Sequence, residues 1–267
     1  MKRSRLFWFV GILAMLVVGL ATAWIHNALP QDSFYHFREA SISGPGQRVL
    51  VFTPHPDDES IAIGGYLYNC QTAGAEVRVV LVTDGNRRGM KDRRYQEFQQ
   101  ATEQLLVPAE ELRYWGYPDG QLDKHLEELD IQVRAEIALF HPDVVVYSHP
   151  QDRHPDHAAL GRSVEAVLGQ DAEFDGQIKA YAYLVHYKYY PEPQMLSRQS
   201  YLLPPASIAS HNEDWEKVSL SPEAQQAKHA AIQLYRTQLH NPFLTPLFLG
   251  LQRSNELLVA RLISSQA

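Results

Sequence analysis

Residues 48–59 read RVLVFTPHPDDE, an apolar run that ends in a polar turn. A short run of β-prone residues bounded by Pro is typical of a buried strand, so we expect residues 48–53 to deliver His55, Asp57 and Asp58 to the edge of a sheet. Imidazole and carboxylate groups bind divalent metals such as Zn²⁺, and a further carboxylate can take a proton from water. The stretch therefore predicts part of a metal site and its base, although a loop that caps a helix would fit the same residues.

A second polar cluster lies about a hundred residues later. Residues 149–157 read HPQDRHPDH and come directly after the apolar run 144–147. Open α/β folds bind ligands at the carboxyl edge of the sheet, so the two clusters can meet there. Together they supply at least two His and one Asp, which leaves coordination positions for water and substrate, as a catalytic metal needs. The third His-Pro-Asp, residues 141–143, precedes its strand, and we interpret it as the end of a helix.

The remainder of the chain alternates between short apolar strands and amphipathic helices. This alternation predicts right-handed βαβ units and an α/β fold, with a Rossmann-like, mostly parallel sheet and helices on both faces. For residues 188–221, which are rich in Pro and Tyr, we expect irregular or antiparallel structure. The expected strands are 48–53, 76–83, 112–114, 143–148 and 178–185, and the expected helices are 59–73, 93–106, 122–140, 157–168 and 222–239.

Residues 1–29 are expected to form a membrane anchor or a signal segment. Three cations, Lys2, Arg3 and Arg5, precede the uncharged run 6–25, which has about the length that spans a bilayer. Residues 21–23 (ATA) have the pattern of a signal cleavage site, so removal of the segment stays open, but we favour a retained single-pass anchor. The charge bias places the N-terminus in the cytoplasm and the catalytic domain outside it, in the periplasm or at the cell surface. Residues 30–47 are predicted to be a tether and residues 48–267 a single domain.

Composition restricts the classes of partner and of metal site. A net charge of −7 gives no electrostatic reason to expect nucleic acid. Cys70 is the one cysteine, so neither an internal disulfide nor a Cys-based zinc site can form, and any metal must be held by His and carboxylates. We expect Cys70 to be a small buried residue. No feature of the sequence specifies an oligomer.

The two polar clusters resemble the motifs of the PIG-L/LmbE-like de-N-acetylases, zinc enzymes that remove acetyl from substrates containing N-acetylglucosamine. The resemblance covers residues 48–239 and rests on HPDDE at 55–59 and HPDH at 154–157. Two departures stand out: Thr237 occupies a position that is usually Ser, and the loop 86–89 (NRRG) is more basic than the family's, which affects the expected substrate. Lesser matches are Thr83, Asp84, Gly85, Arg94, Glu97, Ala101, Lys228, Ala231, Tyr235 and Gln238.

The resemblance implies a metal-binding triad and a base. His55, Asp58 and His157 would hold Zn²⁺, or another divalent metal such as Fe²⁺, and Asp57 would be the general base. The residues alone do not decide which of the neighbouring carboxylates is the ligand. Two His and one carboxylate also occur in non-haem iron oxygenases, but the extra carboxylate favours a hydrolase.

The resemblance also implies roles for residues around the triad. His154 matches a His that stabilises the tetrahedral intermediate and can protonate the leaving amine, and the alternative is a residue of a helix N-terminal loop. We expect Asp156 to hold the His154 imidazole in its charged form, because a nearby carboxylate raises the pKa of a histidine. For Glu59 we expect a helix cap rather than a role in orienting a ligand.

Three arginines are candidate substrate-binding residues. Arg87, Arg88 and Arg153 lie on predicted strand-end loops, where an anionic substrate would explain them, and so would an ordinary solvated surface. Tyr181, Tyr183 and Tyr187 fall at alternating positions of one expected strand, and we expect them to pack in the core rather than to stack on a sugar.

We therefore predict a zinc-dependent hydrolase that removes acetyl from an N-acetylated sugar or glycan and releases acetate and a free amine. An amidase that acts on another N-acyl amine or a thiol conjugate is a second reading of the same site. A membrane-tethered protein that binds metal or sugar without turnover is a reading of another class. Asp57 discriminates between these classes, because a binding protein has no need of a base.

Overall fold

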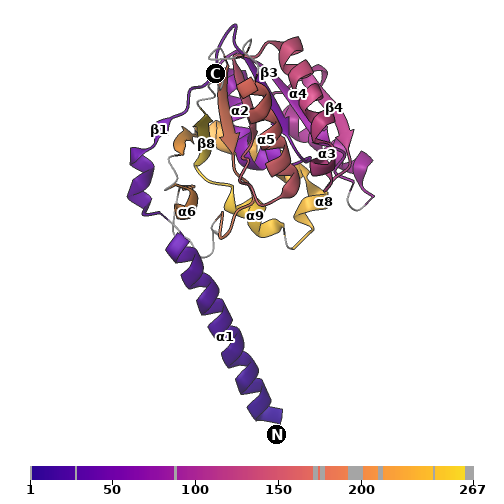
Figure 1. Cartoon of the computed structure of the whole chain (residues 1–267). Coiled ribbons are helices and arrows are strands. Elements are labelled where there is room, and N and C mark those ends of the chain that lie inside the picture. Colours follow the sequence, from indigo (N-terminus) through magenta and orange to yellow (C-terminus); the bar gives the residue numbers. More distant parts are fainter. Residues whose placement is uncertain are drawn as a thin grey trace.

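A single mixed sheet forms the centre of the protein in the computed structural model (Figure 1). The structure describes residues 2–27, 29–86, 89–170, 174, 178–191, 201–209, 213–242 and 244–261, and in the first helix it describes the side chains of residues 8–19 and 22. Within these residues the sheet has eight strands. Their order across the sheet is β4 (Leu112–Tyr117), β3 (Glu76–Thr83), β2 (Arg48–Thr53), β5 (Val144–Ser148), β6 (Lys179–Tyr183), β8 (Asn255–Arg261), β7 (Asp214–Ser219) and β1 (Arg38–Glu39).

The sheet is mostly parallel, which confirms the predicted fold class. Strand β8 runs antiparallel to both of its neighbours, β6 and β7, whereas the other described strand pairs are parallel. Every residue of β5 is buried, as is every residue of β2 after the first. Such continuous apolar strands are typical of parallel sheets that helices cover on both faces.

Two groups of helices cover the sheet. Helices α2 (Asp58–Thr72), α3 (Lys91–Gln104) and α7 (Pro222–Leu234) pack against one another, and α4 (Leu126–Phe140) packs against α5 (Pro155–Gln170). Right-handed crossovers place these two groups on opposite faces. The shorter helical elements are η1 (Gln31–His36), η2 (Ala109–Glu111), η3 (Leu122–Lys124), α6 (Ala206–Ala209), α8 (Arg236–Leu239) and α9 (Thr245–Gly250).

The order of the strands creates a switch point at the centre of the sheet. From β2 the chain proceeds to β3 and β4 on one side, and then returns to β5 and β6 on the other side. Open α/β sheets bind ligands outside the carboxyl ends of the strands at such a point. Residues 54–59 follow β2 and residues 149–157 follow β5, so the fold brings together the two polar clusters.

Most of the predicted elements match the structure, and the exceptions have local causes. The helix expected at 222–239 divides into α7 and α8 at Tyr235, which has φ −77° and ψ 60°. The buried Tyr235 hydroxyl donates to Glu59, so a tertiary hydrogen bond accompanies the break. As predicted, His141 ends α4, and there it adopts the left-handed conformation. Tyr181, Tyr183 and Cys70 are buried in the core, as expected. Tyr187 is only partly buried, because β6 ends at Tyr183 and Tyr187 lies beyond the strand.

The segment predicted as a tether is in fact part of the domain. Strand β1 pairs with β7, and the Phe34 side chain in η1 is buried. The domain therefore begins before residue 48, because backbone pairing and an aromatic anchor fix residues 31–40 against the edge of the sheet.

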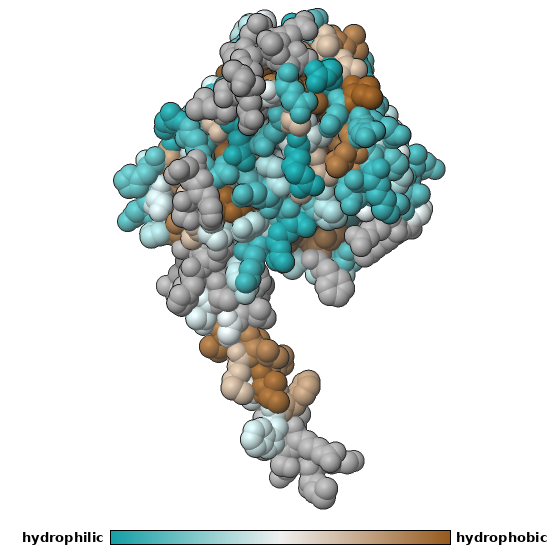
Figure 2. All heavy atoms as spheres, in the orientation of Figure 1, coloured by the Kyte–Doolittle hydropathy of each residue, from teal (hydrophilic) through white to brown (hydrophobic). Residues whose placement is uncertain are grey.

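Helix α1 (Lys2–Asn27) extends away from the domain (Figure 1). Its described apolar side chains, from Trp8 to Val18, are exposed and form the brown stretch below the domain in Figure 2. Within the residues that the structure describes, none of the helices has the length and apolarity needed to cross a membrane.

Helix α2, which begins within the HPDDE motif, is interrupted at Ile63, and the buried ion pair of Lys228 and Glu256 packs beside the interruption. Ile63 departs from helical geometry, and beyond it the backbone N–H groups of Gly65 and Tyr66 donate to the Glu256 carboxylate at 2.8 Å each. Lys228 Nζ lies 2.8 Å from the same carboxylate, and both side chains are buried. One carboxylate of β8 therefore satisfies two backbone donors of α2 and a buried cation of α7.

We expect Glu256→Leu to lower the free energy of unfolding by about 3–5 kcal/mol, because it leaves the Lys228 ammonium buried without a counter-charge. Urea denaturation followed by circular dichroism measures this change. Glu103→Leu, at an exposed position of α3, is the matched control and should stay within about 0.5 kcal/mol of the parent. If the two substitutions lowered the free energy of unfolding equally, the buried ion pair would contribute no more to stability than an exposed glutamate.

Candidate metal centre and active site

Three donor atoms converge where the two polar clusters meet. His55 Nδ1 lies 3.2 Å from His157 Nε2 and 3.3 Å from Asp58 Oδ2, and the last two atoms are 3.0 Å apart. Ligands about 2.0–2.1 Å from a tetrahedral zinc lie roughly 3.3 Å from one another. The three side chains therefore fit a small divalent metal, and they leave coordination positions free.

Each imidazole of this triad also faces a carboxylate with its other ring nitrogen. His55 Nε2 lies 3.0 Å from Asp156 Oδ2, and His157 Nδ1 lies 3.4 Å from Asp152 Oδ2. Carboxylates placed in this way fix the tautomer and the orientation of metal-binding histidines. This arrangement is a second reason to regard the triad as a metal site.

The position of Asp156 corrects the role expected for it. Its carboxylate accepts from His55 and from the backbone N–H groups of Gly120 and Leu122, at 2.7 and 3.0 Å. It makes no described side-chain hydrogen bond with the His154 ring. Asp156 lies at the start of α5, where its side chain turns inward to His55 and to the loop before η3, so it orients His55 rather than charging His154.

The environments of Asp57 and Asp58 differ, which separates the two neighbouring carboxylates. Although burial opposes it, the charges of His157 and His55 hold the pKa of Asp58 well below its usual range. Burial raises the pKa of Asp57 to about 8, despite the opposing charge of Arg94. Asp58 thus has the character of an anionic ligand, and Asp57 that of a base whose pKa is close to neutral.

Asp57 is held in an unusual backbone conformation. Its φ is 143°, in a region that L-residues rarely adopt and that costs about 1–3 kcal/mol. The Glu59 carboxylate accepts the Asp57 backbone N–H at 3.2 Å and also bonds the Tyr235 and Ser60 hydroxyls. Asp57 is the N-cap residue of α2, so Glu59 caps the start of the helix, as expected, and it also fixes the turn that carries Asp57.

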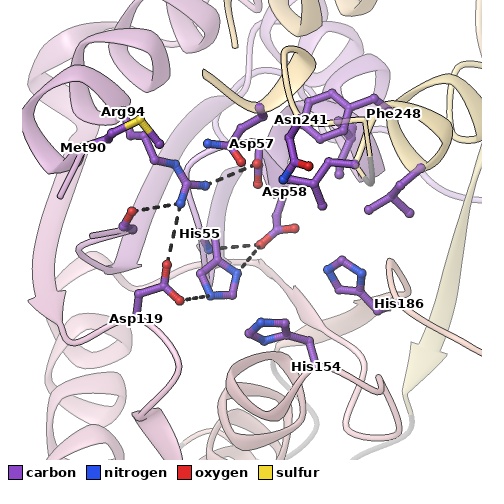
Figure 3. A pocket seen from close by; sticks show the side chains of 15 residues that line it. His55, Asp57, Asp58, Met90, Arg94, Asp119, His154, His186, Asn241 and Phe248 are labelled. Carbon is purple, nitrogen blue, oxygen red and sulfur yellow. Dashed lines mark hydrogen bonds and ion pairs between the residues drawn. The ribbon is translucent and has the colours of Figure 1, made fainter. Parts of the chain in front are cut away.

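Arg94 on α3 clamps the same turn from the other side (Figure 3). Its guanidinium donates to the carbonyls of Pro56 and Gly85 at 3.0 and 2.9 Å, and to Asp57 Oδ2 at 3.3 Å. Gly85 has φ +57°, and a Cβ there would lie 2.9 Å from the Pro56 ring. The sequence suggested Arg94 through the family resemblance alone, because its distance along the chain hides its contact with Asp57.

Asp119 is a site residue that the sequence analysis did not identify. Its carboxylate lies 3.6 Å from His55 Nε2 and 3.7 Å from Arg94 Nη1 (Figure 3). It follows β4, so its place after a strand was the signal that could have revealed it.

His154 and His186 line the cavity above the triad (Figure 3). The His154 ring lies 4.6 Å from the His55 ring between centroids, and its Nδ1 accepts the Asp156 backbone N–H at 3.3 Å. Burial and the neighbouring imidazoles lower the pKa of His154 to about 3, which favours the neutral ring. Because Nδ1 accepts a backbone N–H, the neutral ring would carry its proton on Nε2. His186, which follows β6, was also missed, and its ring centroid is 4.8 Å from that of His157.

More than one donor set is present around the triad. The ligand atoms of His55, His154 and His157 lie within 4.8 Å of one another, as do those of Asp58, His157 and His186. A third set consists of His55, Asp119 and Asp156, and each of the three sets shares at least one donor with the triad described above. The triad has mutual distances of 3.0 to 3.3 Å and two orienting carboxylates, which favour it as the metal site.

The cavity above the triad has a volume of about 380 Å³. An adjoining hollow of about 420 Å³ shares Asp119, His154 and His186 with it and is lined by the exposed Arg153. Arg153 therefore lies beside the site, and its role in substrate binding stays a prediction. Arg87 and Arg88 fall outside the described residues.

We expect Asp156→Asn to weaken zinc binding about 10- to 100-fold, because partners that orient metal-binding histidines typically contribute that much. Competition with a chelating dye measures the affinity. Asp123→Asn, at an exposed position before α4, should leave it unchanged. Unaltered zinc affinity in Asp156→Asn would show that the carboxylate does not orient His55.

The fold and the site together define an α/β protein with a candidate His/Asp metal centre and a further buried carboxylate at the switch point of its sheet. Residues 50–168 match the family model described as PIG-L: GlcNAc-PI de-N-acetylase. The match covers less than half of the chain, and it agrees with the resemblance to this family seen in the motifs.

Two curated relatives have deacetylase names. A probable N-acetyl-alpha-D-glucosaminyl L-malate deacetylase 2 of Bacillus cereus is 31% identical over 134 residues, which cover 44% of this chain and 59% of the relative. A diacetylchitobiose deacetylase of Thermococcus kodakarensis is 29% identical over 135 residues, or 45% of this chain and 49% of the relative. The chain thus spans about half of the length of these relatives.

Solved structures support the fold over a larger part of the chain. A zinc-inhibited form of teicoplanin deacetylase has a TM-score of 0.62 at 16% identity. The superposition covers 83% of this chain and 100% of the deacetylase chain. The N,N'-diacetylchitobiose deacetylase of Pyrococcus horikoshii has a TM-score of 0.56 at 21% identity, covering 80% of this chain and 84% of its own. At these identities the likeness concerns the fold.

Proposed function

We propose that the protein is a metal-dependent hydrolase that removes acetyl from an N-acetylated amino sugar. The observation that carries this proposal is the pairing of the His55–Asp58–His157 triad with Asp57, a buried carboxylate outside the ligand set. The names of the curated relatives support the bond that is broken and the class of substrate.

The proposed chemistry divides between a metal and the side chains around it. When bound by the triad, a divalent metal such as Zn²⁺ supplies Lewis-acid chemistry, polarising the amide carbonyl and making water more acidic. Asp57 accepts the proton of the attacking water at its carboxylate and passes it to the leaving amine. A base with a pKa near the working pH is best suited to this exchange, which agrees with the raised pKa of Asp57.

His154 is proposed to stabilise the oxyanion. Its Nδ1 accepts a backbone N–H, so the neutral ring has an Nε2–H available to the cavity. A fixed donor that faces the developing negative charge stabilises the tetrahedral intermediate without reorganisation. Because the ring is neutral, we assign the protonation of the amine to Asp57 rather than to His154.

Polar groups at one side of the cavity suit a sugar. Arg94 and Asp119 face the site beside His55 and can bond hydroxyl groups, and Arg153 lines the adjoining hollow. Each of these groups offers strong hydrogen bonds to a polar substrate. An amidase for another N-acyl amine uses the same triad and base, and a binding protein without turnover would leave Asp57 unexplained.

Mass spectrometry of the purified, zinc-loaded protein with a panel of N-acetylated glycans tests the proposed activity. Loss of the acetyl mass from any glycan, together with release of acetate, supports it. Absence of turnover on the whole panel and on N-acetylated amines of other kinds would favour a binding protein. Reloading the metal-free protein with Fe²⁺ instead of Zn²⁺ identifies the metal that supports turnover.

We further propose that the N-terminal segment places the catalytic domain outside the cytoplasm. The uncharged run 6–25 and the cations before it support this orientation, as do the exposed apolar side chains of α1. Envelope or exported glycans are then the substrates within reach. Whether the segment is retained or cleaved, the domain lies on the same side.

With this orientation, alkaline phosphatase fused after Ala267 should be active, and green fluorescent protein at the same position should be dark. The matched control deletes residues 2–25 from both fusions and should reverse the pattern. Fluorescence of the full-length fusion, with inactive phosphatase, would place the enzyme in the cytosol and favour a small substrate there.

A further inference from the structure

One side of the cavity is apolar, and it is built mainly by a segment beyond residues 50–168. Leu247 and Phe248 of α9 and Leu244 just before it line the cavity, and Ile61 of α2 continues this surface. Phe248 and Ile61 are buried, and Leu244 and Leu247 are partly buried and pack against the core. We call these four residues the apolar wall.

The apolar wall begins next to the reacting centre. Ile61 lies one helical turn after the two carboxylates, and its backbone N–H donates to the Asp57 carbonyl at 3.0 Å. Figure 3 shows Phe248 on the side of Asp58 and His186, whereas Arg94 and Asp119 lie on the other side of His55. The cavity therefore presents a polar side and an apolar side to a substrate whose scissile bond sits between them.

Two polar residues, Gln238 and Asn241, also line the cavity near α9. The Gln238 amide donates to Thr237 Oγ1 at 3.0 Å, and Asn241 also has a polar partner. Each has a partner within the chain, and the other cavity-lining residues near α9 are aliphatic or aromatic.

We propose that the apolar wall binds the acyl chain of the scissile amide, and that the enzyme prefers acyl groups longer than acetyl. This inference rests on the proposed amide hydrolysis. An amino-sugar amide has two substituents of opposite character: the hydroxyl-bearing sugar on nitrogen and the alkyl group on the carbonyl carbon. Arg94 and Asp119 match the sugar, so the alkyl group faces the wall. An acetyl methyl needs little more than Ile61, whereas Leu244, Leu247 and Phe248 extend the surface for further methylenes.

The test compares acyl lengths on one sugar. Methyl glycosides of glucosamine bearing acetyl, butanoyl, hexanoyl or octanoyl amides are given to the zinc-loaded full-length protein, and release of the free amine is followed. Each methylene that becomes buried should raise kcat/KM about fourfold until the wall is covered. The octyl glycoside of N-acetylglucosamine places the same alkyl chain on the other end of the sugar and should show no such gain.

Two substitutions on α9 provide the matched comparison. Leu247→Trp fills the wall and should lower the ratio of kcat/KM for hexanoyl over acetyl about tenfold. Leu249 is exposed and lies outside the cavity, so Leu249→Trp should keep the parent ratio. If both variants have the same ratio of kcat/KM for hexanoyl over acetyl, Leu247 does not contribute to recognition of the acyl chain.

The outcomes separate this inference from the proposed function. Turnover that is fastest with acetyl and falls with each methylene leaves the hydrolase standing and overturns the preference for longer chains. A gain with the octyl glycoside alone assigns the wall to the aglycone and likewise overturns it. Failure to cleave any of the amides, with zinc bound, rejects both proposals together.

Discussion

Asp57→Asn is expected to lower kcat about 10²- to 10⁴-fold while the zinc content stays at the parent level. The amide has nearly the same shape as the carboxylate but cannot accept a proton, and a positioned general base typically contributes this much. Asn also tolerates positive φ better than most residues, so the turn at φ 143° should persist. Steady-state kinetics together with elemental analysis of the same preparation check both parts of the prediction.

Asp123→Asn is the matched control for this substitution, because it makes the same chemical change at an exposed site. It should retain full activity and full zinc content. Near-normal turnover in Asp57→Asn would remove Asp57 from the role of base. Loss of zinc in that variant would instead make Asp57 a ligand and reverse its assignment with Asp58.

Much of the sheet could be predicted because its central strands are short apolar runs with clear ends. The bounds of β2 and β3 agree with the expected strands 48–53 and 76–83. Strands β1 and β8 were not predicted, and β7 lies in the region 188–221, for which irregular or antiparallel structure was expected. Strand β1 has two residues, and the partners of β7 and β8 are distant in the sequence, so pairing rather than local pattern creates them.

The candidate site shows the same division between local pattern and tertiary contact. His55, Asp58 and His157 could be named because each belongs to a compact motif at the end of a strand. The pairing of Asp156 with His55 could not be predicted, because the direction of the Asp156 side chain depends on its hydrogen bonds with the backbone N–H groups of Gly120 and Leu122. Arg94 acts on Asp57 across 37 positions, and His186 is a single histidine after β6, so neither has a motif of its own.

The carboxylates that orient the triad histidines, Asp152 and Asp156, connect the surrounding loops to the metal affinity of the triad. Asp152 accepts the backbone N–H groups of Val185 and His186 and also faces His157. A single buried carboxylate thus connects the loop after β6 to a ligand on α5. Changes in that loop should therefore reach the metal site through Asp152, even where they do not touch a donor atom.

His157→Ala and Asp58→Ala are expected to lose zinc as well as activity. Removing one of three protein ligands leaves too few to hold the ion against water and buffer, so zinc affinity should fall further than the roughly 10- to 100-fold expected when an orienting carboxylate such as Asp156 is lost. Zinc content after dialysis and dye competition measure the loss independently of turnover. His141→Asn is the control, because it alters the His-Pro-Asp copy that ends α4, and it should keep a full complement of zinc.

A further pair of variants decides between the triad and the donor set that includes His186. Asp58 and His157 are common to the triad and to the set that includes His186, so the two sets differ in His55 and His186. If the triad holds the metal, His55→Ala loses zinc and His186→Ala keeps it. Zinc loss in His186→Ala, with retention in His55→Ala, would move the metal toward β6. The mutual distances of 3.0 to 3.3 Å within the triad, and the hydrogen bond from His55 to Asp156, support the first result.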